Sequence, residues 1–186
     1  MDIQPQAARF HTEATADGLK VVIPARRNWV TVLFLSAWLG GWAMGETNVA
    51  GQLLHGGGKT AAAFLVFWLV AWTLGGIFAL GSVLWQLAGR EVLTANSTAL
   101  IHRVEIFGLG VNRSYAASGI KNLRATERPA SPTSNQRVLF PPLFGAGHGL
   151  IAFDYGARTI RTGSSLDEAE AKLLVSSLAP HLPRQL

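Results

Sequence analysis

The chain has 186 residues, of which 49% are hydrophobic, and its formal net charge is +5 at pH 7. It contains no cysteine, which excludes disulfides, thiolate metal sites and cysteine nucleophiles. All six tryptophans lie between Trp29 and Trp85, within two apolar runs without formal charge, residues 29–45 and 61–87. This distribution predicts an integral membrane protein with one soluble domain of about 100 residues.

The first 27 residues precede the apolar runs. Residues 1–17 are polar and without periodicity, which predicts a mobile N-terminal tail. Residues 18–27 are expected to supply the first strand of the soluble domain, ended by Pro24. Because this strand is isolated in the sequence, we expect it to pair with the part of the domain that follows the apolar runs.

The two apolar runs predict a transmembrane hairpin: helix 28–46, external loop 47–60 and helix 61–87. A bilayer core of about 30 Å needs about 20 helical residues, so the second run spans readily and the first is near the lower limit. Lys and Arg flank the outer ends of both runs, whereas the connection holds only Lys59. This asymmetry predicts a multi-pass membrane protein with both termini cytoplasmic. The runs contain no acid or histidine, which argues against a haem, a proton relay or an ion path through them.

Small residues on both runs are candidates for helix packing, because they let backbones approach closely in lipid. Two interpretations remain open, packing of the two helices against each other and homodimerisation. The candidates are Gly41, Gly45, Ala71, Gly75 and Ala79.

Beyond Arg90 the pattern alternates as in β-strands, and a helix follows whose first turn is expected to carry a capping box, Ser165 to Glu168. The sequence therefore predicts an α+β soluble domain in which antiparallel strands are capped by a C-terminal helix. His102 lies in the apolar phase of its strand. With no acid or second histidine beside it in the sequence, we interpret it as a structural histidine.

Residues 127–148 form a long proline-rich loop with an apolar centre, VLFPPLF. It is expected either to pack over the sheet or to contact lipid headgroups or a partner helix. Basic residues lie along and before it, as a membrane-surface contact requires. The candidate contact residues are Arg113, Lys121, Arg124, Arg128, Arg137, Phe140 and Phe144. Nucleic acid is not expected as a partner, because the chain is tethered to a bilayer and has no recognition motif.

The sequence contains no paired catalytic groups, so we expect no catalytic, cofactor-binding or metal-binding residues. A membrane-bound enzyme is the alternative, and it would use His102, His148, Asp154 or Tyr155. A further alternative is an accessory subunit of a larger membrane complex.

The order of elements resembles a family of small bacterial membrane proteins. The likeness begins with a strand ending in IPARRNW, two transmembrane helices and Gly89-Arg90-Glu91-Val92. It continues through the segments LIHRVEIFGLGVNRSYAASGIKNLRA and GLIAFDYGARTIRTG to the closing helix LDEAEAKLLVSSL. These proteins join two transmembrane helices to a pleckstrin-homology-like (PH-like) domain. The resemblance implies a curved, PH-like antiparallel sheet capped by a C-terminal helix, over residues 88–182, in a protein of the bacterial inner (cytoplasmic) membrane. The absence of paired catalytic groups, together with the basic and apolar surface candidates, predicts an interaction or assembly module with anionic lipid headgroups or another membrane protein as partners.

Overall fold

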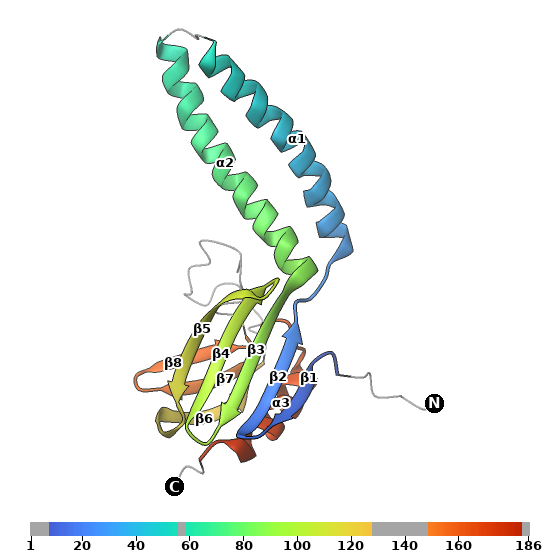
Figure 1. Cartoon of the computed structure of the whole chain (residues 1–186), viewed down its shortest axis with the longest axis vertical. Helices are drawn as coiled ribbons and strands as arrows, with labels where there is room; N and C mark the ends of the chain where they lie inside the picture. The colour runs from blue at the N-terminus through green and yellow to red at the C-terminus, as the bar shows by residue number, and fades with distance from the viewer. Residues whose placement is uncertain (1–7, 56–58, 128–148, 184–186) are drawn as a thin grey trace, which may run out of the picture. The chain divides into compact units, whose positions relative to one another are not determined.

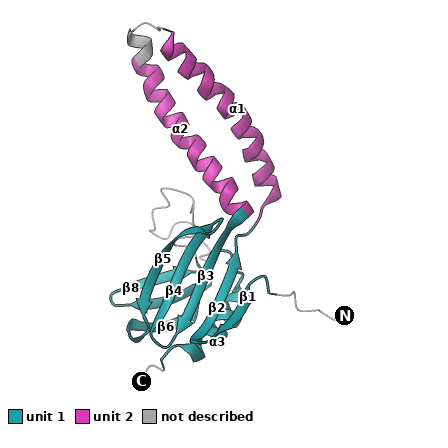
Figure 2. Cartoon of the chain, viewed as in Figure 1, with its two compact units in different colours: residues 1–26, 88–186 teal, residues 27–87 magenta. Residues whose placement is uncertain are grey.

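A computed structural model describes residues 8–55, 59–127 and 149–183, with the side chains of residues 59–62 left out. The chain divides into two compact units. One comprises Met1–Arg26 and Ala88–Leu186, and the other comprises Arg27–Leu87 (Figure 2). The soluble-domain unit is therefore discontinuous in sequence, with the helical unit inserted between its second and third strands.

The helical unit consists of α1 (Trp29–Leu54) and α2 (Lys59–Ala88). Asn28 caps α1, because its side-chain oxygen accepts hydrogen bonds from the backbone N–H groups of Val30 and Thr31 at 3.1 and 3.3 Å. The predicted end of the first helix at residue 46 is wrong, because residues 47–54 continue α1, and residues 56–58 of the predicted loop 47–60 lie outside the described residues. The external position of this connection stays a prediction. Of the described helices, one is long and apolar enough to cross a membrane: Ala63–Ala88, with a mean hydropathy of 2.1.

The larger sheet, sheet A, is antiparallel and follows chain order (Figure 1). Its strands are β1 (His11–Thr15), β2 (Gly18–Pro24), β3 (Gly89–Asn96), β4 (Ala99–Ile106) and β5 (Leu109–Ala116). The expected pairing of the isolated strand is confirmed, with Gly18 opposite Asn96 and Pro24 opposite Arg90. The prediction of a tail over residues 1–17 is wrong for β1, which hydrogen-bonds to β2 along its whole length.

The smaller sheet, sheet B, contains β6 (Ile120–Ala125), β7 (Ile151–Tyr155) and β8 (Arg158–Thr162). A short 3-10 turn, η1 (Ala117–Gly119), leads into it, and α3 (Glu168–Leu178) and η2 (Ala179–His181) follow it. The expected α+β architecture, antiparallel sheets with a packed C-terminal helix, is present. The strands form two sheets, however, and the loop predicted over residues 127–148 lies outside the described residues except for Glu127.

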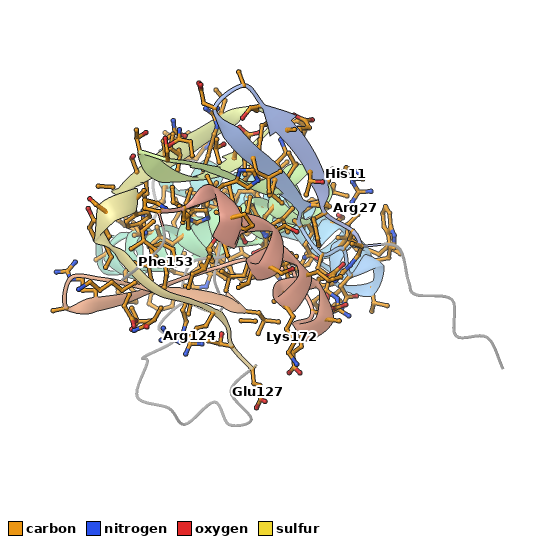
Figure 3. The ribbon with its side chains drawn as sticks, turned by 90° about the horizontal axis from the view of Figure 1, so that it is seen from below. His11, Arg27, Arg124, Glu127, Phe153 and Lys172 are labelled. Atoms are coloured by element: carbon orange, nitrogen blue, oxygen red, sulfur yellow. The ribbon has the colours of Figure 1, made fainter. Side chains whose placement is uncertain are left out.

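One core joins both sheets and α3. Its largest fully buried apolar side chains come from β2, β3, β4, β7, α3 and the segments that flank β7 and α3: Val21, Ile23, Leu93, Leu100, Leu150, Ile151, Phe153, Leu166, Leu174 and Leu178. Figure 3 shows Phe153 inside the domain, between the strands. Tyr115 of β5 lies edge-on to Phe153 with ring centroids 5.1 Å apart, which ties sheet A to sheet B.

Helix α3 begins two residues later than expected. Asp167 is its N-cap, and the capping box joins Asp167 to Glu170 instead of Ser165 to Glu168. The Asp167 side chain accepts from the Glu170 N–H at 2.8 Å, and the Glu170 carboxylate accepts from the Asp167 N–H at 2.9 Å. This shift places Glu170, a buried acid, where it meets the segment that precedes β1.

The chain leaves and re-enters the soluble unit at neighbouring positions. Pro24 at the end of β2 pairs with Arg90 near the start of β3, and the Ala25 N–H donates to the Gly89 carbonyl at 2.9 Å. Gly89 follows directly after Ala88, the last residue of α2, so no linker separates helix from sheet. The end of sheet A that contains Pro24 and Gly89 is therefore the end connected to both helices.

Candidate functional site

The two helices of the inserted unit hold each other through tryptophans and one glycine. The indole N–H of Trp42 donates to the Trp72 carbonyl at 3.0 Å, and the Trp72 indole N–H donates to the Trp42 carbonyl at 3.4 Å. A Cβ atom on Gly76 would lie 2.1 Å from the Trp42 ring, so only glycine fits there. Trp72 also stacks on Trp68, with ring centroids 4.7 Å apart. These contacts make a specific helix pair from two largely apolar helices.

Of the small residues predicted to pack the helices, some lie at the contact between α1 and α2 and others lie on exposed helix surface. Ala79 is buried, and a Cβ atom added to Gly45 would lie 3.6 Å from the indole nitrogen of Trp72, which is ordinary contact. Gly41, Ala71 and Gly75 lie on exposed helix surface, and no atom lies within 4 Å of a Cβ built on Gly41 or Gly75. Within the described hairpin, the close approach uses Gly76, one position from the predicted glycine.

An acidic side chain lies within the helix pair. Glu46 is the last residue of the predicted first helix, but α1 continues past it, and its carboxylate lies 2.5 Å from the Thr73 hydroxyl on α2. Thr73 is ten residues inside the apolar span that begins at Ala63, or about 15 Å along the helix. The apolar runs 29–45 and 61–87 contain no acid, as stated above, but the longer helix α1 does, because Glu46 directly follows the first run.

The basic residues predicted on β6 do come together, on the outward face of sheet B. Lys121 is opposite Asp154 of β7, which is opposite Thr159 of β8; Arg124 is opposite Ala152, which is opposite Arg161. These residues share the sheet face that points away from Phe153, because side chains alternate along a strand. We call Lys121, Arg124 and Arg161 the basic face. Arg161 was missed by the sequence analysis, although the alternation of the sequence RTIRT placed it on this face.

Asp154 is the acid at the centre of the basic face. It accepts hydrogen bonds from Asn122 at 3.0 Å, from the Thr159 hydroxyl at 2.7 Å, and from Arg124 at 3.1 Å. These bonds lower the pKa of Asp154 to about 2. Arg124 is thus held in an ion pair, and three cations share the face with one carboxylate.

The other predicted contact residues do not join this face. Arg113 lies on the exposed strand β5, opposite His102 of β4. Arg128, Arg137, Phe140 and Phe144 lie outside the described residues, as does His148, one of the residues named for an enzyme. Figure 3 shows Arg124 at the margin of the domain and Glu127 at the end of the described segment that follows it.

A second cluster is buried and centred on Glu91 of β3. Its carboxylate accepts from the Ser164 hydroxyl at 2.5 Å, the Thr162 hydroxyl at 3.1 Å and the Gly163 N–H at 2.9 Å, and it lies 3.3 Å from His102 Nε2. Burial opposes ionisation, but the hydrogen bonds from His102, Ser164 and Gly163 outweigh it and lower the pKa of Glu91. The cluster fastens the β8–α3 connection to sheet A.

The Glu91 cluster corrects the interpretation of His102, which does have an acid beside it. The arrangement still differs from that of a catalytic triad, where histidine lies between the nucleophile and the acid. Here Glu91 lies between Ser164 and His102, so the Ser164 hydroxyl proton is directed to the carboxylate. Asp154 and Tyr155, also named for an enzyme, point to opposite faces of β7. In the part of the chain that the structure describes, no group of three or more His, Asp or Glu is arranged to hold a metal ion.

A third cluster anchors the N-terminal segment. Arg9 binds Glu170 of α3 through its backbone N–H at 2.9 Å and through its guanidinium at 2.9 and 3.2 Å, and it also donates to the Ser165 carbonyl at 3.2 Å. Burial opposes ionisation of Glu170, but the hydrogen bonds from Arg9 and from the Asp167 N–H lower its pKa to about 2. An open hollow nearby is lined by Arg26, Leu150, Asp167, Glu168 and Ala169.

Comparison with known proteins adds no relative: no family model matches the chain, and neither a curated protein nor a solved structure matches it. The functional argument therefore depends on the chain's own geometry.

Proposed function

We propose that this chain is a membrane-anchored interaction module without catalytic activity. α1 and α2 form a transmembrane hairpin in a bacterial inner membrane, and both termini lie in the cytoplasm. The observation that carries the proposal is the apolar span Ala63–Ala88, which continues into β3 without a linker. A domain joined so directly to a membrane span works at the membrane surface.

The soluble unit is, in this proposal, a PH-like domain with the hairpin inserted between β2 and β3. Support comes from antiparallel strands that share a core with a C-terminal helix, although they form two sheets where the sequence resemblance implies one. The buried clusters of Glu91 and Glu170 are, in this proposal, structural, because their contacts join segments of the domain that are distant in sequence and cap α3. That leaves the exposed surface as the functional part.

The basic face is the proposed contact for anionic lipid headgroups. Positive charge near a bilayer attracts anionic lipids by about 1 kcal/mol per residue close to the surface. Arg124 is engaged by Asp154, so Lys121 and Arg161 are the cations that this interaction would use.

The test measures phosphatidylglycerol retained by the purified full-length chain, using native mass spectrometry. The double variant Lys121→Gln/Arg161→Gln should retain several-fold less than the unaltered chain. Lys172→Gln, which removes an exposed charge on α3, is the matched control and should retain as much as the unaltered chain. Equal retention by all three proteins would contradict the lipid contact.

An accessory subunit of a larger membrane complex is the second candidate. It is favoured by Gly41, Ala71 and Gly75, whose positions on the exposed helix surface would let a helix of another chain approach closely. Extraction in a mild detergent followed by size measurement separates the two candidates. A monomer or homodimer would contradict the subunit hypothesis, and a defined larger complex would support it.

A further inference from the structure

The turn between β4 and β5 combines exposed apolar side chains with an unusual backbone. Ile106 pairs with Leu109, so the connection is the two residues Phe107 and Gly108, with φ angles of +51° and +82°. Positive φ at both positions is the mark of a type I′ hairpin turn. Phe107, Leu109 and Val111 are 74%, 82% and 68% exposed. We call these three residues the β4–β5 tip.

Phenylalanine is an unfavourable residue at its place in this turn. Type I′ turns favour Asn, Asp or Gly at the first central position, because a bulky side chain is strained at positive φ, by a cost on the order of 1 kcal/mol. Buried packing does not compensate here, because the Phe107 ring is exposed. An aromatic residue that is both strained and exposed indicates contact with something outside the domain.

The register places the tip at the end of sheet A connected to the helices. Gly89 pairs with Ile106, and Ile106 pairs with Leu109. Strands are about 4.8 Å apart, so Leu109 lies about 10 Å from Gly89. Gly89 directly follows the apolar span Ala63–Ala88, and the covalent connection alone keeps the tip within a short distance of the span's end. The headgroup layer on each side of a bilayer is itself about 5 to 8 Å thick.

A hydrogen bond from Arg103 holds the backbone of the tip, and positively charged side chains lie beside it. Arg103 donates to the Gly108 carbonyl at 2.6 Å and to the Glu105 carboxylate at 2.5 Å, and Glu105 also accepts from Arg90. Two cations around one acid leave a net positive charge. Cations beside exposed apolar side chains are the combination that binds an anionic membrane interface.

We propose that the β4–β5 tip inserts into the headgroup layer of the bilayer that α2 spans. The tip is a second membrane contact, which orients the soluble domain against the lipid surface. This inference rests on the proposed membrane anchoring, and it is separate from the contact proposed for the basic face.

The absence of native cysteine allows a direct test with the full-length chain. Single cysteines replace Phe107, Leu109 or Ser97, and each is labelled with an environment-sensitive fluorophore. Ser97 is the control, because it is exposed in the β3–β4 turn at the opposite end of sheet A. The proteins are reconstituted in vesicles of phosphatidylcholine and phosphatidylglycerol in equal parts. Quenching is measured with nitroxides placed high on the lipid chains and with aqueous iodide.

Lipid nitroxides should quench the Phe107→Cys and Leu109→Cys probes several-fold more than the Ser97→Cys probe, and iodide should show the reverse order. Equal iodide quenching at all three sites, in protein that floats with the vesicles, would overturn the tip proposal alone. Protection from iodide without quenching by lipid nitroxides would show that protein covers the tip, which also overturns it. Protein that fails to float with the vesicles would overturn the membrane anchoring itself, and the tip proposal with it.

Discussion

Arg9 and Glu170, which are 161 positions apart, are joined by one backbone and two guanidinium hydrogen bonds. Arg9 precedes the first strand, and Glu170 closes the capping box of the last helix. This contact joins the segment that precedes the inserted helices in the sequence to the segment that follows them. The unit is therefore complete only when the segments before and after the hairpin have both been made.

Loss of this contact should destabilise the soluble unit in a pH-dependent way. We expect Arg9→Ala to lower its free energy of unfolding by about 1 kcal/mol, a value reduced for the partial exposure of Arg9. The folded-state pKa of Glu170, about 2, lies below the ordinary value of 4.5. The contribution is therefore full above pH 4.5 and is lost as the pH falls toward 2.

Hydrogen exchange of α3 peptides, measured against pH in the full chain, checks this prediction. Protection should decline between pH 4.5 and pH 2 in the unaltered chain, and this decline should be weaker in Arg9→Ala. Lys20→Ala, which removes an exposed ion pair with Glu13, is the control and should keep the decline. Identical profiles for Arg9→Ala and the unaltered chain would refute the role of the contact.

The Glu91 cluster should be the most sensitive polar site of the domain. Glu91→Ala leaves the donors of Thr162, Gly163 and Ser164 without their acceptor in a buried site. Removal of one partner from a buried charged network costs about 3 to 5 kcal/mol. Ser164→Ala removes one hydroxyl and should cost about 1 kcal/mol. Chemical denaturation in micelles, monitored by hydrogen exchange of β8 and α3 peptides, should show a larger loss of stability in Glu91→Ala than in Ser164→Ala. Equal losses in the two variants would contradict the prediction.

Neighbouring glycines on α2 make a matched pair of variants. In Gly76→Ala the new methyl group would meet the Trp42 ring at 2.1 Å, whereas in Gly75→Ala it would meet no atom within 4 Å. We expect Gly76→Ala to weaken the helix pair by about 1 to 3 kcal/mol and Gly75→Ala to leave it unchanged.

All six tryptophans lie in α1 and α2, so tryptophan fluorescence during unfolding in mixed micelles reports this helix pair directly. If Gly75→Ala proved the more damaging variant, the packing described for Trp42 and Gly76 would be incorrect.

Phe107 should limit the stability of its own turn. Phe107→Asn places a residue that tolerates positive φ before Gly108, and it should stabilise the β4–β5 hairpin by about 1 kcal/mol. The measurement is the exchange protection of β4 and β5 amides in micelles, with Phe107→Ala as the control that removes the ring without relieving the backbone. Lower protection in Phe107→Asn than in Phe107→Ala would contradict the strain assigned to this position.

The sequence reveals some of this architecture through local pattern. Because no strand was predicted beside β2 in the sequence, it was expected to pair with the domain after the hairpin, and it pairs with β3 there as well as with β1. Strand β1 was missed because all five of its residues are exposed and polar or small, without an apolar phase. The continuation of α1 was missed because Glu46 and its polar neighbours resemble a loop, whereas Glu46 meets Thr73 of α2.

The candidate sites depend on contacts that are distant in sequence. Lys121 and Arg124 were predicted from local charge, but Arg161 joins them only through the register of β6, β7 and β8. Glu91 reads as an ordinary strand residue, because its hydrogen-bond donors at the β8–α3 connection are more than 70 positions away. No local pattern contains that information.

The central claim is that α1 and α2 cross the membrane and leave the soluble unit on the cytoplasmic side. A membrane-impermeant thiol reagent tests it directly, with single cysteines in place of Leu54, at the end of α1, and Ser97, in the β3–β4 turn. In spheroplasts, the account predicts that Leu54→Cys is labelled at once and Ser97→Cys only after lysis. Labelling of Ser97→Cys in intact spheroplasts, or labelling of both sites only after lysis, would contradict it.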